Sequence, residues 1–220
     1  MIPIRDHNPS STTPRITYAL IGINIAVFVL MFSLSPTQLE SFIYRYELIP
    51  SFIMHGQALQ TLFTSMFLHG GIGHILGNMM FLNIFGDNLE DRLGHIKYLI
   101  FYLLCGLAAS ALQIIIDPGS QIPNLGASGA IAGLMGGYLV LFPTHKIDVL
   151  IPFFGFFNRS TVPAFTMLFY WIFFQFLSGF GQLGTAESGG IAYFAHIGGF
   201  LAGIVMVIIF SIFRRRPAEV

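Results

Sequence analysis

Long apolar stretches separated by short charged ones dominate the pattern of the chain. Six stretches contain no Asp, Glu, Lys or Arg, at residues 16–39, 48–86, 98–116, 118–145, 160–186 and 188–213. A helix needs about 20 mostly apolar residues to cross the hydrocarbon core of a bilayer, and each stretch can hold one such helix. We therefore predict an all-α, six-helix membrane bundle, with spans at 16–34, 72–88, 97–116, 127–143, 162–179 and 191–213.

One further apolar segment, Ser41–Leu68, does not fit a continuous span. It is interrupted by Arg45, Glu47, Pro50 and Gly56, and proline in particular resists a continuous helix. We predict an irregular loop with short helical pieces, lying partly in the outer leaflet.

The composition agrees with a membrane protein of one domain. Hydrophobic residues make up 55% of the chain and charged residues only 9%, whereas soluble domains have about 25% charged residues. Six spans at 16–213 leave room only for a short N-terminal segment (1–15) and a basic tail (214–220). The zero net charge gives no indication of a nucleic-acid partner, and membrane lipid is the expected surrounding.

The basic residues give the spans a direction. With a cytoplasmic N-terminus, nine of the ten Lys and Arg residues lie on the inside, and only Arg45 lies outside. We therefore expect an integral membrane protein with both termini in the cytoplasm. Its short ends, with no transit segment, favour a prokaryotic plasma membrane.

This topology brings three span ends to the same depth. Spans two, four and six all enter from the outer face, and their first residues carry His74 with Asn78, Ser128, and His196. Strongly polar side chains inside a bilayer are costly and usually mark a functional site. These four residues are the candidate site.

Ser128 and His196 form a possible nucleophile and base. Ser128 begins a helix, where free backbone N–H groups and the helix dipole can hold an oxyanion. His196, Gly199 and Gly203 share one helix face, and the fourth span offers Gly129, Gly133 and Gly136 or Gly137 to match. Such small-residue stripes allow close helix packing, which could bring the imidazole to the Ser128 hydroxyl. The alternatives are a helix-capping serine and a histidine bonded to a carbonyl group.

His74 and Asn78 are four residues apart and project from one helix face. Both can donate hydrogen bonds to a tetrahedral oxyanion. The alternative is a pair of ordinary interhelical hydrogen bonds. His69, just before the span, is interpreted as a residue that orders the loop.

With these residues in these positions, the chain resembles the rhomboid family of intramembrane proteases along nearly its whole length. The resemblance is carried by five motifs in order: Phe67-Leu68-His69-Gly70-Gly71, His74-x-x-x-Asn78, Gly86 to Gly94 (GDNLEDRLG), Gly126-x-Ser128-Gly129, and Ala195-His196-x-x-Gly199-x-x-x-Gly203. It implies a Ser–His dyad of Ser128 and His196. It also implies an oxyanion site formed by the Ser128 backbone N–H, Asn78 and His74.

The resemblance also implies a substrate. Family members cut single-span transmembrane proteins near the outer face and need no cofactor. The fifth span (Pro163–Gly179) with the loop Ser178–Gly190 is the expected gate and cap. Two features depart from the family pattern: Gln60-Thr61 stands where many relatives have Trp-Arg, and Ala132 stands where some relatives have an aromatic residue that stacks on the catalytic histidine.

Other classes fit the sequence less well. No His-Glu-x-x-His zinc motif is present, and every aspartate lies at a span end or in a loop, unlike the paired aspartates of an aspartyl protease. A non-catalytic rhomboid-like protein that binds transmembrane clients is the main alternative. A transporter would place its polar groups near the middle of the membrane.

Overall fold

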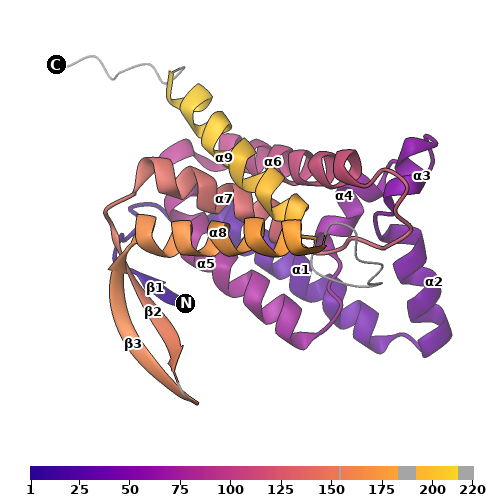
Figure 1. Ribbon diagram of the computed structural model, residues 1–220, viewed down its shortest axis with the longest axis horizontal. Helices are drawn as coiled ribbons and strands as arrows, with labels where there is room; N and C mark the ends of the chain where they lie inside the picture. Colours follow the sequence, from indigo (N-terminus) through magenta and orange to yellow (C-terminus); the bar gives the residue numbers. More distant parts are fainter. Residues whose placement is uncertain (154, 183–191, 213–220) are drawn as a thin grey trace.

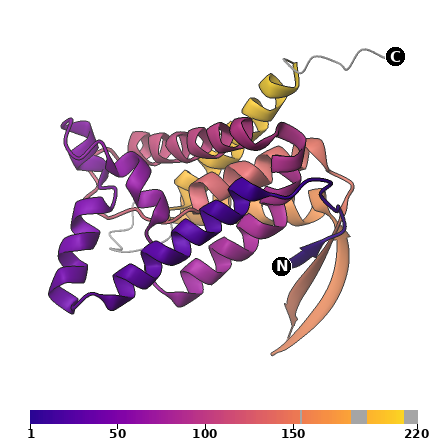
Figure 2. The same ribbon diagram turned by 180° about the vertical axis from the view of Figure 1, so that it is seen from behind.

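Six long helices occupy the six segments predicted as spans. The computed structural model describes the whole chain except residues 154, 183–191 and 213–220, so the predicted basic tail and most of the predicted cap lie outside the described residues. The helices are α1 (Arg15–Ser33), α5 (Ile72–Leu93), α6 (His95–Ile116), α7 (Ser128–Leu141), α8 (Ala164–Gln182) and α9 (Tyr193–Ile212). Figures 1 and 2 show α7 in the middle of the bundle, covered on both sides by the others.

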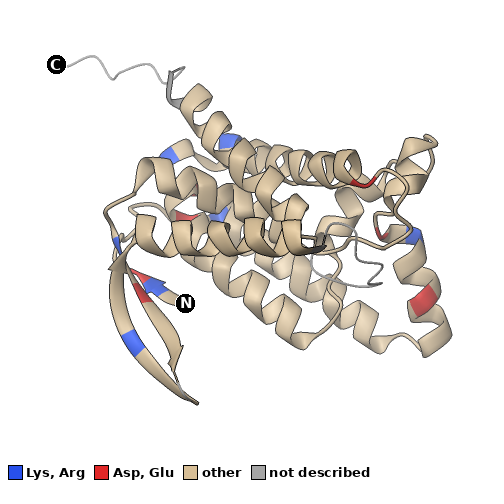
Figure 3. Ribbon diagram, viewed as in Figure 1, with Lys and Arg blue, Asp and Glu red and all other residues tan. Residues whose placement is uncertain are grey.

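Four of these helices, α1, α6, α8 and α9, are long and apolar enough to cross a bilayer, as judged over the described residues. Helix α7 is apolar but has only 14 residues, about 21 Å, which is shorter than a hydrocarbon core of roughly 30 Å. Helix α5 has 22 residues but carries Asp87, Glu90, Asp91 and Arg92 near its end. The chain is therefore a mostly helical, polytopic membrane protein, and six crossings are not confirmed. Charged residues lie toward the two ends of the bundle (Figure 3).

The segment predicted as an irregular loop consists of short helical pieces, as expected. These are α2 (Pro36–Tyr46), α3 (Pro50–Met54), α4 (Thr61–Thr64) and the 3-10 turn η1 (Ser65–Phe67). The backbones of Leu48 and Asn124 exchange two hydrogen bonds of 3.0 and 2.7 Å. They tie this segment to the loop that precedes α7.

The expectation of an all-α fold is wrong at the other end of the bundle. There a three-stranded antiparallel sheet, in the order β1-β2-β3, is built from β1 (Ile2–Asp6), β2 (Lys146–Phe153) and β3 (Phe156–Pro163). Only Lys146–Val149 of β2 alternate polar and apolar residues, the period of a half-buried strand, and Gly155 (φ +82°) lies in the turn. Charge gaps long enough for a helix do not reveal segments this short. The N-terminal segment is thus paired with the connection between α7 and α8.

A buried carboxylate joins three helices at this end. Glu90 on α5 accepts hydrogen bonds from the backbone N–H groups of Ile16 (2.8 Å) and Thr17 (2.7 Å), and it contacts His95 Nδ1 at 2.5 Å. The residue before α1 is Pro14, whose side chain cannot cap a helix. Glu90 therefore supplies the acceptors that the first turn of α1 needs. This gives a structural role to Glu90 in the acidic motif at the end of α5.

Close contact between α7 and α9 depends on glycine. Residues Gly129–Tyr138 of α7 are all buried. A Cβ added at Gly199 would overlap the carbonyl oxygen of Gly129, and one at Gly203 would overlap that of Gly133. The close approach predicted from the small-residue stripes is confirmed, and it sets the position of His196 relative to α7.

Candidate active site

Ser128 stands at the first position of α7. The first hydrogen bond of the helix runs from the Ile131 N–H to the Ala127 carbonyl (3.0 Å). The N–H groups of Ser128 and the next residues therefore have no acceptor inside the helix. Gly126 precedes the helix with φ +122°, where a side chain would be strained, and a Cβ there would lie 2.7 Å from His74 Nε2. Glycine thus lets the loop pass beside His74 and leaves open donors beside the Ser128 side chain.

The imidazole of His196 contacts the Ser128 hydroxyl. Ser128 Oγ lies 2.8 Å from His196 Nε2, although the two residues are on different helices. His196 is 8% exposed. The geometry allows the serine to donate its proton to the imidazole, the arrangement that activates a serine nucleophile.

Two residues of α8 hold the other side of the imidazole, and the sequence reasoning did not identify either of them. Gln175 Oε1 lies 2.7 Å from His196 Nδ1. An amide oxygen can only accept, so Nδ1 carries the ring proton and Nε2 is left free to accept from Ser128. The Trp171 ring packs on His196 with centroids 5.6 Å apart. Trp171 and Gln175 are one turn apart on α8.

Ala132 is buried and has no ring that could stack on His196. The aromatic partner of the histidine comes from α8 instead of α7. A Trp and a Gln at i and i+4 on an apolar helix were the only available signal, and without the packing of α8 against α9 that signal points to no particular neighbour.

His74 and Asn78, both on α5, face the loop before Ser128. The Gly70 N–H donates to His74 Nδ1 at 3.4 Å, which leaves Nε2 of a neutral ring as a donor. Asn78 is buried, and no described protein group accepts from its Nδ2. A Cβ at Gly126 would lie 2.7 Å from His74 Nε2 and 3.6 Å from Asn78 Nδ2. Both donors therefore point to the same place, beside the start of α7.

His69 lies next to this pair but is outside the helices. Its ring packs edge-on against His74, with centroids 5.1 Å apart, and it is 1% exposed. Burial first, and then the neighbouring His74 ring, lower the pKa of His69 to about 4, so the ring is neutral at pH 7. Its contacts fit the predicted role of ordering the loop.

A cavity of about 560 Å³ joins these groups. Its wall contains His74, Asn78, Ser128, Trp171 and His196, and the rest of its lining is mostly small or apolar: Gly73, Gly77, Phe81, Pro123, Asn124, Leu125, Ile131, Met135 and Ala192. Among the described residues that line the cavity, none is Asp or Glu. The four residues predicted as a site thus border one space, at the end of the bundle away from the sheet.

Comparisons with known proteins give one consistent result. Residues 55–213 match the family model described as Rhomboid domain. The chain is 29% identical over 200 residues to rhomboid protein 1, mitochondrial, of Saccharomyces cerevisiae, covering 88% of this chain and 53% of that protein. It is 28% identical over 162 residues to RHOMBOID-like protein 1 of Arabidopsis thaliana (74% and 37%).

A bacterial protein is similar as well. Rhomboid protease GluP of Bacillus subtilis is 32% identical over 134 residues, covering 60% of this chain and 26% of that protein. The chain therefore spans about half or less of the length of these curated relatives. Because they include mitochondrial, plant and bacterial proteins, they support an integral membrane protein and give no support to the prediction of a prokaryotic plasma membrane.

Proposed function

The chain belongs to the rhomboid family, and on that premise we propose that it is an intramembrane serine endopeptidase. Its substrates are the transmembrane helices of single-span membrane proteins, cut near the outer membrane face. The observation that carries the proposal is the 2.8 Å contact between Ser128 Oγ and His196 Nε2 at the wall of the cavity.

The reaction proceeds by acyl transfer. His196 Nε2 takes the Ser128 proton while Oγ bonds to the carbonyl carbon of the scissile peptide. The negative charge moves to the carbonyl oxygen, where the Ser128 N–H, Asn78 Nδ2 and His74 Nε2 donate to it. His196 then gives its proton to the leaving amine as the C–N bond breaks. A water molecule, deprotonated by His196, hydrolyses the acyl-enzyme and restores Ser128.

Gln175 acts as a positioning residue. Its amide oxygen keeps the proton of His196 on Nδ1, so that the lone pair of Nε2 faces the serine. In triads of serine proteases a carboxylate has this orienting role. Here a neutral acceptor on α8 fills it, and Trp171 restricts the ring from one face.

The membrane arrangement that we propose has six crossings and cytoplasmic termini. Helix α7 is too short to span the core alone, yet it is surrounded by longer helices and needs no contact with lipid. Its first residue therefore lies below the membrane surface. A substrate helix must unwind locally to expose a peptide bond there, so residues of poor helix propensity near the cut favour cleavage.

Active-site labelling tests this proposal. Purified protein in mild detergent is treated with a fluorophosphonate probe, beside the variants Ser128→Ala and His196→Ala. We expect labelling of the wild type only, since the probe requires an activated serine. Thermal unfolding of all three proteins establishes that the variants are folded.

Two outcomes contradict the proposal. Wild type that fails to label under conditions where it is folded indicates a rhomboid-like protein that binds transmembrane clients without cutting them. Equal labelling of Ser128→Ala places the reactive group elsewhere.

A further inference from the structure

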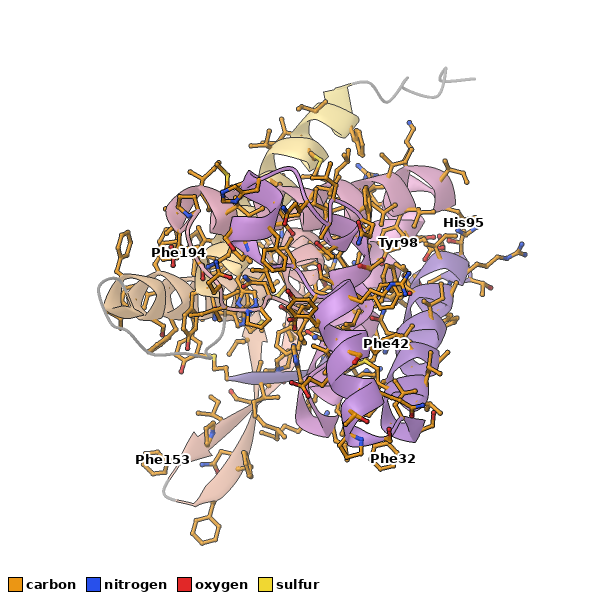
Figure 4. The ribbon with its side chains drawn as sticks, turned by 90° about the vertical axis from the view of Figure 1, so that its right-hand side faces the viewer. Phe32, Phe42, His95, Tyr98, Phe153 and Phe194 are labelled. Carbon is orange, nitrogen blue, oxygen red and sulfur yellow. The ribbon has the colours of Figure 1, made fainter. Side chains whose placement is uncertain are left out.

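The β2–β3 hairpin projects sideways from the bundle at the end that carries the N-terminus. In Figure 1 the long helices run along the horizontal axis and the strands run across it. In Figure 4, which looks from the side, the hairpin extends beyond the helices, with Phe153 at its far end. Because α1, α6, α8 and α9 are the helices fit to cross a bilayer, a hairpin lying across them runs parallel to the membrane surface.

One face of the hairpin looks toward the helices and is apolar. Ile147 and Val149 on β2 are fully buried in the core of the bundle. Side chains alternate along a strand, so Ile151 follows on the same face and packs partly against the core. Near the hairpin end, Phe156 lies on this face too, because its strand partner is Phe153. On this face β3 places Ser160 and Asn158 opposite Val149 and Ile151, so from there outward the apolar residues of the face are those of β2 and of the hairpin end. By the same register Phe157, the partner of Pro152, lies on the opposite face.

The opposite face carries a charged network. Asp148 accepts hydrogen bonds from Arg159 Nη2 and Thr161 Oγ1, both at 2.6 Å. His7, which follows β1, contacts the same carboxylate at 3.0 Å. These groups face away from the helices, and therefore away from the bilayer. The hairpin is amphipathic in the orientation that a membrane surface requires.

The end of the hairpin is rich in exposed aromatic rings. Phe156 is 76% exposed and Phe157 is 63% exposed. Directly after β3, helix α8 begins, and its exposed residues Phe165, Phe169 and Phe173 follow one another at four-residue spacing along one face. The hairpin end and one face of the membrane-spanning helix that follows therefore both expose aromatic rings.

We propose that the β2–β3 hairpin lies on the membrane surface at the N-terminal end of the bundle and inserts its aromatic end into the lipid. Lipid is the occupant that fits, because the apolar face points the way the helices enter the bilayer and the charges point to water. The start of α8 is also bonded to the turn that follows α7, through Ala164 N–H to His145 O (2.7 Å) and Phe165 N–H to Pro143 O (2.9 Å). In the proposed arrangement the hairpin also attaches the start of α8 to the membrane surface. The inference does not depend on protease activity.

Spin-label accessibility tests it in the intact protein. Single-cysteine variants Phe153→Cys, Phe156→Cys and, as a control on the polar face, Lys146→Cys are made in a Cys105→Ala background. They are reconstituted in vesicles of phosphatidylethanolamine and phosphatidylglycerol, with a nickel chelate on both sides of the membrane. Collision rates with oxygen and with the chelate are measured by electron paramagnetic resonance.

We expect labels at 153 and 156 to collide severalfold more with oxygen than with the chelate, and the label at 146 to show the reverse. Labels at 153 and 156 that are as accessible to the chelate as 146 would place the hairpin in water and overturn the proposal. Low accessibility to both reagents at 156 would indicate a protein interface, such as pairing of β3 with a second copy, and would overturn it too. The two tip positions serve as independent tests if one variant does not fold.

Discussion

At the residue scale, the candidate site combines groups from four helices around one hydroxyl. The sequence predicted Ser128, His196, His74 and Asn78, because each is a strongly polar residue at the outer end of a predicted span. It did not predict Gln175 or Trp171, because nothing in a glutamine on an apolar helix says which neighbour its amide oxygen will meet. Their contacts with His196 depend on how α8 packs against α9.

Asn78 is the donor whose removal is easiest to interpret, because its Nδ2 has no other partner among the described residues. We expect Asn78→Ala to lower kcat by about 10²- to 10³-fold, corresponding to about 2.7–4 kcal/mol of transition-state stabilisation, with a smaller change in KM. Cleavage of a quenched fluorescent transmembrane peptide measures both constants. The matched control is Asn83→Ala on the same helix, since Asn83 is exposed and does not line the cavity. Equal losses in the two variants would argue against an oxyanion role.

Gln175 predicts a different signature. Gln175→Met keeps the side-chain length but removes the acceptor, and we expect kcat to fall about tenfold, the worth of one hydrogen bond of ~1.4 kcal/mol. Gln175→Glu keeps the acceptor, so most of the activity should return. The added negative charge favours the protonated imidazole, and His196 must be unprotonated to act as a base, so the acidic limb of the pH–rate profile should move to higher pH. Unchanged profiles in both variants would exclude the positioning role.

At the element scale, the arrangement of α7 and α9 depends on the absence of side chains at their contact. The small-residue stripes were sufficient to predict this pairing, because closely packed helices need small residues at regular spacing along the contact. The sheet left a weaker mark: its strands are short, and β1 finds its partner about 140 residues later in the chain. Length-based reasoning about spans therefore missed it.

The glycine contact can be tested by adding one methyl group. In Gly199→Ala the new Cβ would overlap the Gly129 carbonyl oxygen, and the helices can relieve this only by moving apart. We expect a loss of about 1–3 kcal/mol in the free energy of unfolding, together with weaker fluorophosphonate labelling because His196 moves away from Ser128. Gly22→Ala on α1 is the control, since no atom lies within 4 Å of the added Cβ. Thermal unfolding in detergent should separate the two variants, and equal stability would contradict the packing argument.

At the scale of the whole molecule, the positions of the long helices could be predicted from the sequence, whereas their arrangement could not. The six predicted segments contain long helices, and four of these helices, among the described residues, are long and apolar enough to cross a bilayer. The number of true crossings, the pairing of the N-terminal segment and the orientation of the base depend on long-range contacts, which the composition of a segment does not contain.

The stability of the whole protein should depend on acid through Asp148. Hydrogen bonds from Thr161 first, and then from Arg159 and His7, hold the pKa of this carboxyl well below its usual range. A carboxyl group whose pKa is lower in the folded state stabilises that state above the pKa of the unfolded chain, near 3.8, and the benefit is lost as the pH falls through and below that value. We expect Asp148→Asn to lower Tm at pH 7, and the difference from wild type to shrink between pH 5 and pH 3. Asp117→Asn, at an exposed position, is the control, and a difference independent of pH would contradict the charge argument.

The contacts of α8 with His196 also bear on timing. If α8 is the element that shifts to admit a substrate, the movement that opens the site also withdraws Gln175 and Trp171 from the imidazole. The enzyme would then be idle while open and reactive again only after α8 returns with a helix inside. Cleavage would then require a substrate helix to stay bound until α8 returns. A helix that leaves sooner would escape cleavage even if its peptide bonds are chemically suitable.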